Sequence, residues 1–176
     1  MIDRTLYSSR LDSGRLELKS EEFDLRQLVE DVCARQREVT TQFTIELAAP
    51  AAPVLICADS NLIDHVLSNL ISNAVKYSGR SRRIEISVLD LGAAVELSVH
   101  DHGVGIPDNE VPKLFARFYR ASTAAGISGT GIGLYLVREI VALHGGDIRV
   151  ESKLGEGSHF IVTLPRAVLE ERRISA

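Results

Sequence analysis

The glycines of this chain are concentrated in one segment. Ten of the 13 glycines lie between positions 103 and 157, whereas the first hundred residues carry the mixture of apolar and polar residues that builds a core. Glycine permits positive φ angles and close approach of the backbone to a ligand. The second half of the chain therefore contains either many tight turns between strands or loops whose backbone contacts a ligand, and the arrangement of the glycines must decide between them.

Length and composition exclude several classes of protein. The chain has 176 residues, 45% of them apolar, which fits one globular domain with short appendages. Its net charge of −4 argues against sequence-independent nucleic-acid binding, which needs a basic face. No apolar run approaches the roughly 18 residues of a membrane span. Cys33 and Cys57 lack CxxC spacing, which argues against a disulfide framework or a zinc site. We therefore expect a cytoplasmic location and no membrane contact by this part, although a longer protein could be anchored in a membrane.

The periodicity of apolar residues predicts an α+β fold. Helical spacing is expected over 25–38, 60–77 and 131–144, with Asp24 as one N-cap and either Asp59 or Ser60 as the next. Strands are expected at 43–47, 54–57 (a buried strand), 84–88, 95–99, 147–152 and 158–164, the last four as two hairpins, with a short helical piece near 112–117. These elements predict a two-layer α/β sandwich with a mixed, mostly antiparallel sheet.

The helix predicted over 60–77 carries an unusual polar face. At about 100° per residue, Asn69, Asn73 and Lys76 lie together beside the apolar face. Asparagine is a weak helix former, so two of them one turn apart are unexpected on a solvent face. One interpretation is a plain polar flank. The other is a site with neutral oxygen ligands and a cation, suited to magnesium bound together with substrate phosphates.

Two glycine motifs follow this helix. Asp101-His-Gly103-Val-Gly105 comes at a predicted strand end, where the carboxylate either caps a turn or accepts a hydrogen bond from an exocyclic amine such as that of adenine. Gly129-Thr-Gly131-Ile-Gly133 opens directly into a helix, so successive N–H groups at a helix N-terminus favour phosphate binding. The second motif has neither the Lys-Ser/Thr of a Walker A loop nor the spacing of a dinucleotide-binding loop.

An aromatic and basic segment separates the two glycine motifs. Residues 113–120 combine two phenylalanines and a tyrosine with three basic residues. They form either a hydrophobic plug with charged edges or the anchor of a mobile lid in which Arg120 reaches phosphates. Residues 121–128 are small and featureless, as in a flexible lid or a disordered loop.

Taken in order, these segments resemble the ATP-binding catalytic domain of sensor histidine kinases, in the superfamily shared with gyrase, Hsp90 and MutL. The resemblance covers roughly residues 22–165. It is carried by an N box (Asn69-Leu-Ile-Ser-Asn73-Ala-Val-Lys76-Tyr77-Ser78), a G1 box (Asp101-His-Gly103-Val-Gly105-Ile106), an F box (Leu114-Phe-Ala-Arg-Phe118-Tyr-Arg120), a G2 box (Gly129-Thr-Gly131-Ile-Gly133-Leu134), and the closing stretches His144-Gly-Gly146 and Gly155-Glu-Gly157-Ser158. His102 departs from the asparagine that often follows the G1 aspartate.

The resemblance implies a five-stranded sheet covered by about three helices on one face, a flexible ATP lid, and a site for ATP and Mg²⁺. Asn73 would ligate the metal, assisted by Asn69, while Lys76 and Arg120 would meet phosphates. Asp101 would accept from the adenine amine with help from Ser158. The other residues that the resemblance places at the nucleotide are Tyr77, Gly103, Gly105, Ile106, Gly129, Thr130, Gly131, Gly133 and Leu134.

Two absences shape the expected reaction. The superfamily's hydrolases place a glutamate base where this chain has Asn69, so we expect poor hydrolysis and transfer of the γ-phosphoryl group to a protein side chain. None of the five histidines has the sequence context of the family's phosphorylated histidine. The resemblance therefore implies a dimerisation domain elsewhere as acceptor, a response regulator receiver domain as further partner, and no autophosphorylation by this chain alone.

The implied organisation is the end of a dimerisation helix and linker over 1–21, the kinase domain over 22–166 and a tail over 167–176, with the isolated chain a monomer or weak dimer. Three alternatives remain. An anti-sigma-type serine kinase would have no use for the linker-like residues 6–20. A gyrase- or MutL-like ATPase would need the glutamate base and a transducer domain. A nucleotide-binding interaction module is disfavoured because the ligand-contacting motif residues are intact.

Overall fold

A mixed sheet of five strands organises the fold in the computed structural model, which describes residues 18–166. Its spatial order is β2 (Thr44–Ala48), β4 (Arg83–Asp90), β5 (Ala94–Asp101), β7 (Gly157–Pro165) and β6 (Asp147–Lys153). Strands β2 and β4 run parallel, and every other neighbouring pair is antiparallel. The two predicted hairpins, β4–β5 and β6–β7, are confirmed, and β7 pairs with β5 to join them.

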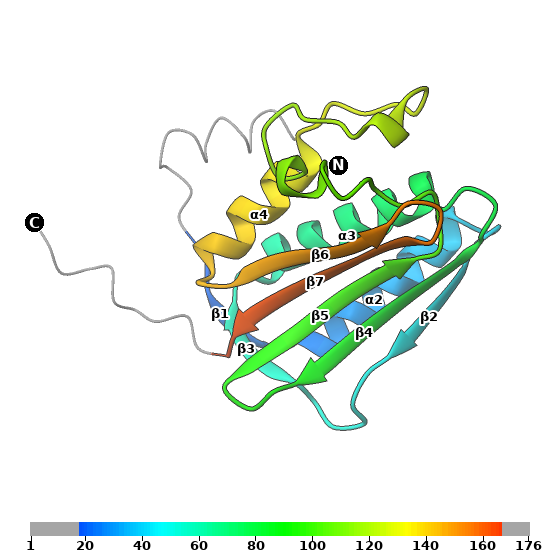
Figure 1. The fold of residues 1–176 in the computed structure, drawn as a ribbon. Coiled ribbons are helices and arrows are strands. Elements are labelled where there is room, and N and C mark those ends of the chain that lie inside the picture. The colour runs from blue at the N-terminus through cyan, green and yellow to red at the C-terminus, as the bar shows by residue number, and fades with distance from the viewer. Residues whose placement is uncertain (1–17, 167–176) are drawn as a thin grey trace, which may run out of the picture.

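Helices cover one face of this sheet (Figure 1). They are α2 (Leu25–Val39), α3 (Ser60–Tyr77) and α4 (Gly133–Leu143). Their apolar sides pack on the inward side chains of the strands, which alternate with outward polar ones, and together they form the core. The opposite face of the sheet, turned toward the viewer in Figure 1, is covered by none of the described elements. The predicted two-layer α+β sandwich is therefore confirmed.

Polar groups fix the helix ends. Asp24 accepts from the N–H of Arg26 at α2, and Asp59, rather than Ser60, accepts from the N–H of Leu62 at α3. His144 follows α4 and is only 1% exposed. Its Nδ1 donates to the carbonyl of Ile140 at 2.7 Å, and its Nε2 accepts from the N–H of Asp59 at 3.0 Å. This imidazole therefore joins the C-terminal end of α4 to the N-terminal end of α3.

A second, small sheet differs from the sequence-based expectation. Strand β1 (Glu21–Asp24), which was not predicted, pairs antiparallel with β3 (Leu55–Ala58). The segment 54–57 was expected to be a buried strand; Val54 and Ile56 are buried, but Leu55 points to the other side of the strand and is 45% exposed. Helix α4 starts at Gly133 and not at Gly131, since φ of Gly131 is +70°, outside the helical region.

The segment between β5 and α4 contains two short 3₁₀ turns, η1 (Val111–Lys113) and η2 (Ser122–Ala124), and lies above one end of the sheet (Figure 1). No helix among residues 18–166 is long and apolar enough to cross a bilayer. Of the linker and dimerisation-helix end expected over 1–21, residues 1–17 lie outside the described residues, as does the tail expected over 167–176.

Candidate functional site

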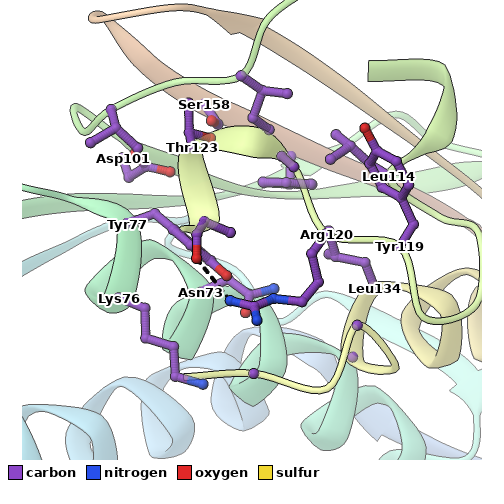
Figure 2. A pocket seen from close by; sticks show the side chains of 18 of the residues that line it. Asn73, Lys76, Tyr77, Asp101, Leu114, Tyr119, Arg120, Thr123, Leu134 and Ser158 are labelled. Atoms are coloured by element: carbon purple, nitrogen blue, oxygen red, sulfur yellow. Dashed lines mark hydrogen bonds between the residues drawn. The ribbon is translucent and has the colours of Figure 1, made fainter. Parts of the chain in front are cut away.

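A cavity open to solvent lies between α3, the ends of β5 and β7, and the segment 104–134 (Figure 2). The lining residues come from all four glycine, asparagine and aromatic motifs: Asn69, Asn73, Lys76, Tyr77, Asp101, Val104, Gly105, Ile106, Leu114, Tyr119, Arg120, Ala121, Thr123, Ala124, Ser128, Gly129, Gly131, Gly133, Leu134, Ser158 and Phe160. Lining residues from Asn69 to Phe160, distant in the sequence, therefore share one site.

The last turns of α3 supply the polar wall of the cavity. Asn73, Lys76 and Tyr77 line it and are at least partly exposed. Asn69 also lines it but is only 2% exposed, because its side chain packs against the first residue of α4. A Cβ on Gly133 would lie 2.6 Å from Asn69 Oδ1, so only glycine fits here without a shift. Figure 2 shows Asn73 and Lys76 toward one end of the cavity and Asp101 with Ser158 toward the other.

Asp101 is the acid at the second end. It is 4% exposed, it accepts from the N–H of Gly103 at 2.9 Å, and it is held by the N–H of Ser158 as well. Burial raises the pKa of its carboxyl to about 6, although these two N–H groups act in the opposite direction. At neutral pH the group is therefore mainly an ionised carboxylate, which only accepts hydrogen bonds.

A chain of hydroxyl groups supports this end of the cavity. Ser152 Oγ donates to the carbonyl of Gly157 at 2.7 Å and accepts from the N–H of Ile106 at 3.0 Å. Ser158 Oγ lies 2.9 Å from Ser152 Oγ. Since the proton of Ser152 is used, Ser158 donates to Ser152, and its lone pairs remain directed to other partners. Sequence reasoning missed Ser152, because nothing in its local pattern marks it.

Arg120 has a different role in this structure from the one expected. Its Nη2 donates to the carbonyl of Ala124 at 2.8 Å and to that of Ile127. The guanidinium thus ties together the backbone of the segment 121–128, which was expected to be a lid. Arg120 still lines the cavity, so it can meet a ligand only by sharing or exchanging these contacts.

Two of the expected nucleotide-binding residues do not line the cavity. Gly103 packs against the carbonyl of Tyr77, where a Cβ would lie 2.0 Å away. Thr130 is exposed to solvent. The structure brings the other expected residues together at the cavity. It adds lining residues that the sequence analysis did not assign to a ligand: Val104, Leu114, Tyr119, Ala121, Thr123, Ala124, Ser128 and Phe160. Of these, Leu114 and Tyr119 belong to the aromatic segment, Val104 lies inside the first glycine motif, and the four residues between 121 and 128 belong to the segment expected as a lid.

The residues present fit a nucleotide with a divalent cation. The buried carboxylate of Asp101 and the apolar side chains around it suit a heterocycle with an exocyclic amine. Among the described residues that line the cavity, Asp101 is the only acid, and the opposite end offers amide oxygens and Lys76. A hard cation there would need negative charge from phosphates, which matches the way Mg²⁺ binds with phosphate ligands.

Comparisons with known proteins agree with this arrangement. The pattern of the family described as "Histidine kinase-, DNA gyrase B-, and HSP90-like ATPase" matches residues 58–168. The chain belongs to this family, whose fold binds ATP, and its fold and site define the catalytic domain of a sensor histidine kinase.

The individual proteins that this chain resembles are sensor histidine kinases. The chain is 32% identical to the sensor protein kinase WalK of Staphylococcus saprophyticus over 97% of its own length but only 29% of that protein. It is 30% identical to the catalytic domain of the histidine kinase ThkA, with a TM-score of 0.73, covering 86% of this chain and 97% of that one. It also matches full-length ShkA, solved in complex with AMPPNP, at 27% identity and a TM-score of 0.80, covering 94% of this chain and 35% of that one. This chain is thus similar to nearly all of an isolated catalytic domain, and to about a third of the longer kinases.

Proposed function

We propose that this chain binds Mg²⁺·ATP and transfers the γ-phosphoryl group to a histidine on a dimerisation domain outside the described residues, for relay to a response regulator receiver domain. The observation that supports this most is the polarity of the cavity. One end holds a buried carboxylate acceptor, Asp101, and the other holds the amide of Asn73 and the ammonium of Lys76. An adenine base has an amine that can donate to the carboxylate at one end, and a triphosphate with its cation suits the amide and the ammonium at the other.

Each wall of the cavity has a defined task in this proposal. Asp101, kept in place by two backbone N–H groups, accepts from the adenine amine, and Ser158 supports it from the neighbouring strand. Asn73 would offer its carbonyl oxygen to Mg²⁺, and Asn69 would assist. The metal supplies charge neutralisation for the phosphates. Lys76 contributes positive charge at the same end, and Arg120 does so when it leaves the carbonyls of the lid.

The chemistry favoured is transfer rather than hydrolysis. In transfer, a bond forms between the γ-phosphorus and an imidazole nitrogen, the bond to the bridging oxygen breaks, and ADP leaves. Positioning and charge neutralisation are sufficient for such a step. Hydrolysis would need a base for water, but Asn69 cannot accept a proton at neutral pH, and the only acid among the described lining residues is Asp101 at the adenine end.

Four of the five histidines of the chain are poorly placed as acceptors. His144 is buried with both ring nitrogens occupied. His100 and His159 are cross-strand partners on the sheet face that points away from the helices, and His102 lies beside them. The acceptor is therefore proposed to come from a separate dimerisation hairpin. The division into 1–21, 22–166 and 167–176, the monomeric or weakly dimeric state and a cytoplasmic location remain part of this proposal.

The test uses ATP labelled at the γ-phosphate and two samples: this chain alone, and this chain with the separately expressed histidine-bearing hairpin of its kinase. We expect acid-labile label on the hairpin only, lost when Asn73→Ala replaces the wild type and kept with Asn61→Ala, an exposed asparagine on the same helix. Acid-labile phosphate on this chain alone would contradict the proposal. Acid-stable label on a serine of a partner protein would instead favour the anti-sigma-type kinase.

A further inference from the structure

A cluster of imidazole and carboxylate groups lies on the sheet face that no described element covers (Figure 1). Successive residues of a strand point to opposite faces. On β5 the buried Asp101 points toward the helices, so His100 and His102, its two neighbours, point outward. Glu85 on β4 is the cross-strand partner of His100, and His159 on β7 is its partner on the other side. Three strands therefore bring these side chains together.

The distances show that the cluster is tight. His102 Nε2 and Glu85 Oε1 are 2.8 Å apart. The ring centroids of His100 and His102 are 4.4 Å apart, and those of His100 and His159 are 5.1 Å apart. One ligand-capable atom each from Glu85, His100 and His102 lies within 4.8 Å of the other two. All three side chains are half-buried, so an ion from solvent could reach them.

We propose that Glu85, His100 and His102 form a binding site for a divalent transition-metal ion of the zinc class on the outer face of the sheet. Two imidazoles and one carboxylate are a ligand set that such ions accept, with solvent completing the coordination. The ring of His159 lies 5.1 Å from that of His100 and helps to orient it. This site is separate from the magnesium expected in the cavity, because the sheet lies between them and the ligands differ: imidazole here, amide oxygen and phosphate there.

A plain surface ion pair explains less of the arrangement. Such a pair needs one histidine, whereas here a second and a third ring crowd against the first. Arg83 also contacts Glu85 at 3.2 Å, but it makes two hydrogen bonds to Glu46 at 2.8 and 3.0 Å. The guanidinium therefore keeps a partner when Glu85 turns to a metal.

The test is a titration of the untagged chain with Zn²⁺ alone, without nucleotide, by calorimetry. We expect one equivalent to bind, and His102→Asn or Glu85→Gln to weaken binding by about 100-fold or more, since even supporting residues around a metal are worth 10- to 100-fold. Two controls keep the residue types constant: His65→Gln on α3 and Glu96→Gln, which faces outward on β5. Both should bind as the wild type does, and thermal unfolding should show every variant folded.

Cobalt supplies a second readout. Bound Co²⁺ should give the visible absorption of a site with nitrogen and oxygen ligands and no thiolate charge-transfer band, because Cys33 and Cys57 take no part. Non-stoichiometric binding, binding that survives both ligand variants, equal loss in His65→Gln, or a thiolate band would each overturn the proposal. The site requires nothing of the nucleotide cavity, so its failure and the failure of the proposed kinase function can be told apart.

Discussion

Replacing Asp101 with asparagine should reverse which base the cavity accepts. The wild-type carboxylate accepts from the N–H of Gly103 at 2.9 Å and from the N–H of Ser158, and its remaining acceptor capacity faces the cavity. In Asp101→Asn the N–H of Gly103 would hold the new carbonyl oxygen, because the NH₂ group cannot accept from it. The amide NH₂ would then point at the amine of adenine, so that a donor faces a donor.

The magnitude follows from two losses. A hydrogen bond to a charged group contributes about 1.5–3 kcal/mol, and a buried donor without a partner costs about 1–3 kcal/mol. Together they predict a loss of about 3 kcal/mol in ATP binding, or about 150-fold in affinity. Inosine triphosphate carries a carbonyl oxygen where ATP has the amine, so the variant's NH₂ should donate to it. We therefore expect the wild type to prefer ATP and the variant to prefer the inosine nucleotide.

Calorimetric titration of both proteins with both nucleotides, in the presence of Mg²⁺, measures this exchange. Asp147→Asn is the matched control, since Asp147 is exposed at the start of β6 and should leave both affinities unchanged. If Asp101→Asn bound ATP within about threefold of the wild type, a difference below about 0.7 kcal/mol, the assignment of Asp101 to the base would be refuted. An unchanged ratio between the two nucleotides would refute it equally.

Three further outcomes can be checked with single substitutions. Asn73→Ala should abolish the part of the ATP affinity that depends on Mg²⁺ and leave the metal-free affinity nearly unchanged. Asn61→Ala should alter neither affinity. Titration of each variant with ATP, with and without Mg²⁺, measures the two affinities. Gly133→Ala would place a Cβ 2.6 Å from Oδ1 of Asn69 and should destabilise the fold by about 1–3 kcal/mol. Gly129→Ala, with open space around it, should not, and equal denaturant midpoints for the two variants would contradict the packing described. Burial lowers the pKa of His144, so at a pH below the usual value of about 6.5 the unfolded chain binds more protons than the folded one. The free energy of unfolding should therefore fall as the pH drops. Urea unfolding at pH 7.5 and 5.5 should show a smaller fall in this free energy for His144→Gln than for the wild type.

The elements with strong local signals were predicted well. The 18 residues of α3 have an apolar face and an N-cap, and the hairpin β4–β5 has alternating residues around a glycine turn. The order of the motifs also predicted which residues share one cavity. In each case the information lies in neighbouring residues or in motif spacing, which is available before any tertiary contact is known.

What the sequence did not predict depends on contacts between distant segments. Strand β1 has four mostly polar residues and exists because β3, more than 30 residues away, pairs with it. The burial of Asn69 follows from the approach of α4, not from its place on its own helix. Ser152 supports the site only because β6 and β7 pair in one particular register, and the meeting of Glu85 with two histidines needs the register of β4 and β5.

The hydrogen bond from the backbone of Asp59 to His144 also determines which end of α4 is held against α3 when the helix tilts. It fastens α3 and α4 at the ends that lie farthest from the cavity, while the residues that line the cavity, such as Gly133, are at the other end of α4. Helix α4 has 11 residues and is about 16 Å long. It can act as a lever with its fulcrum at His144, so that a tilt of about 5° would move its first residue by about 1.4 Å. A small rotation of α4 about its fixed end would therefore change the width of the cavity beside Gly133.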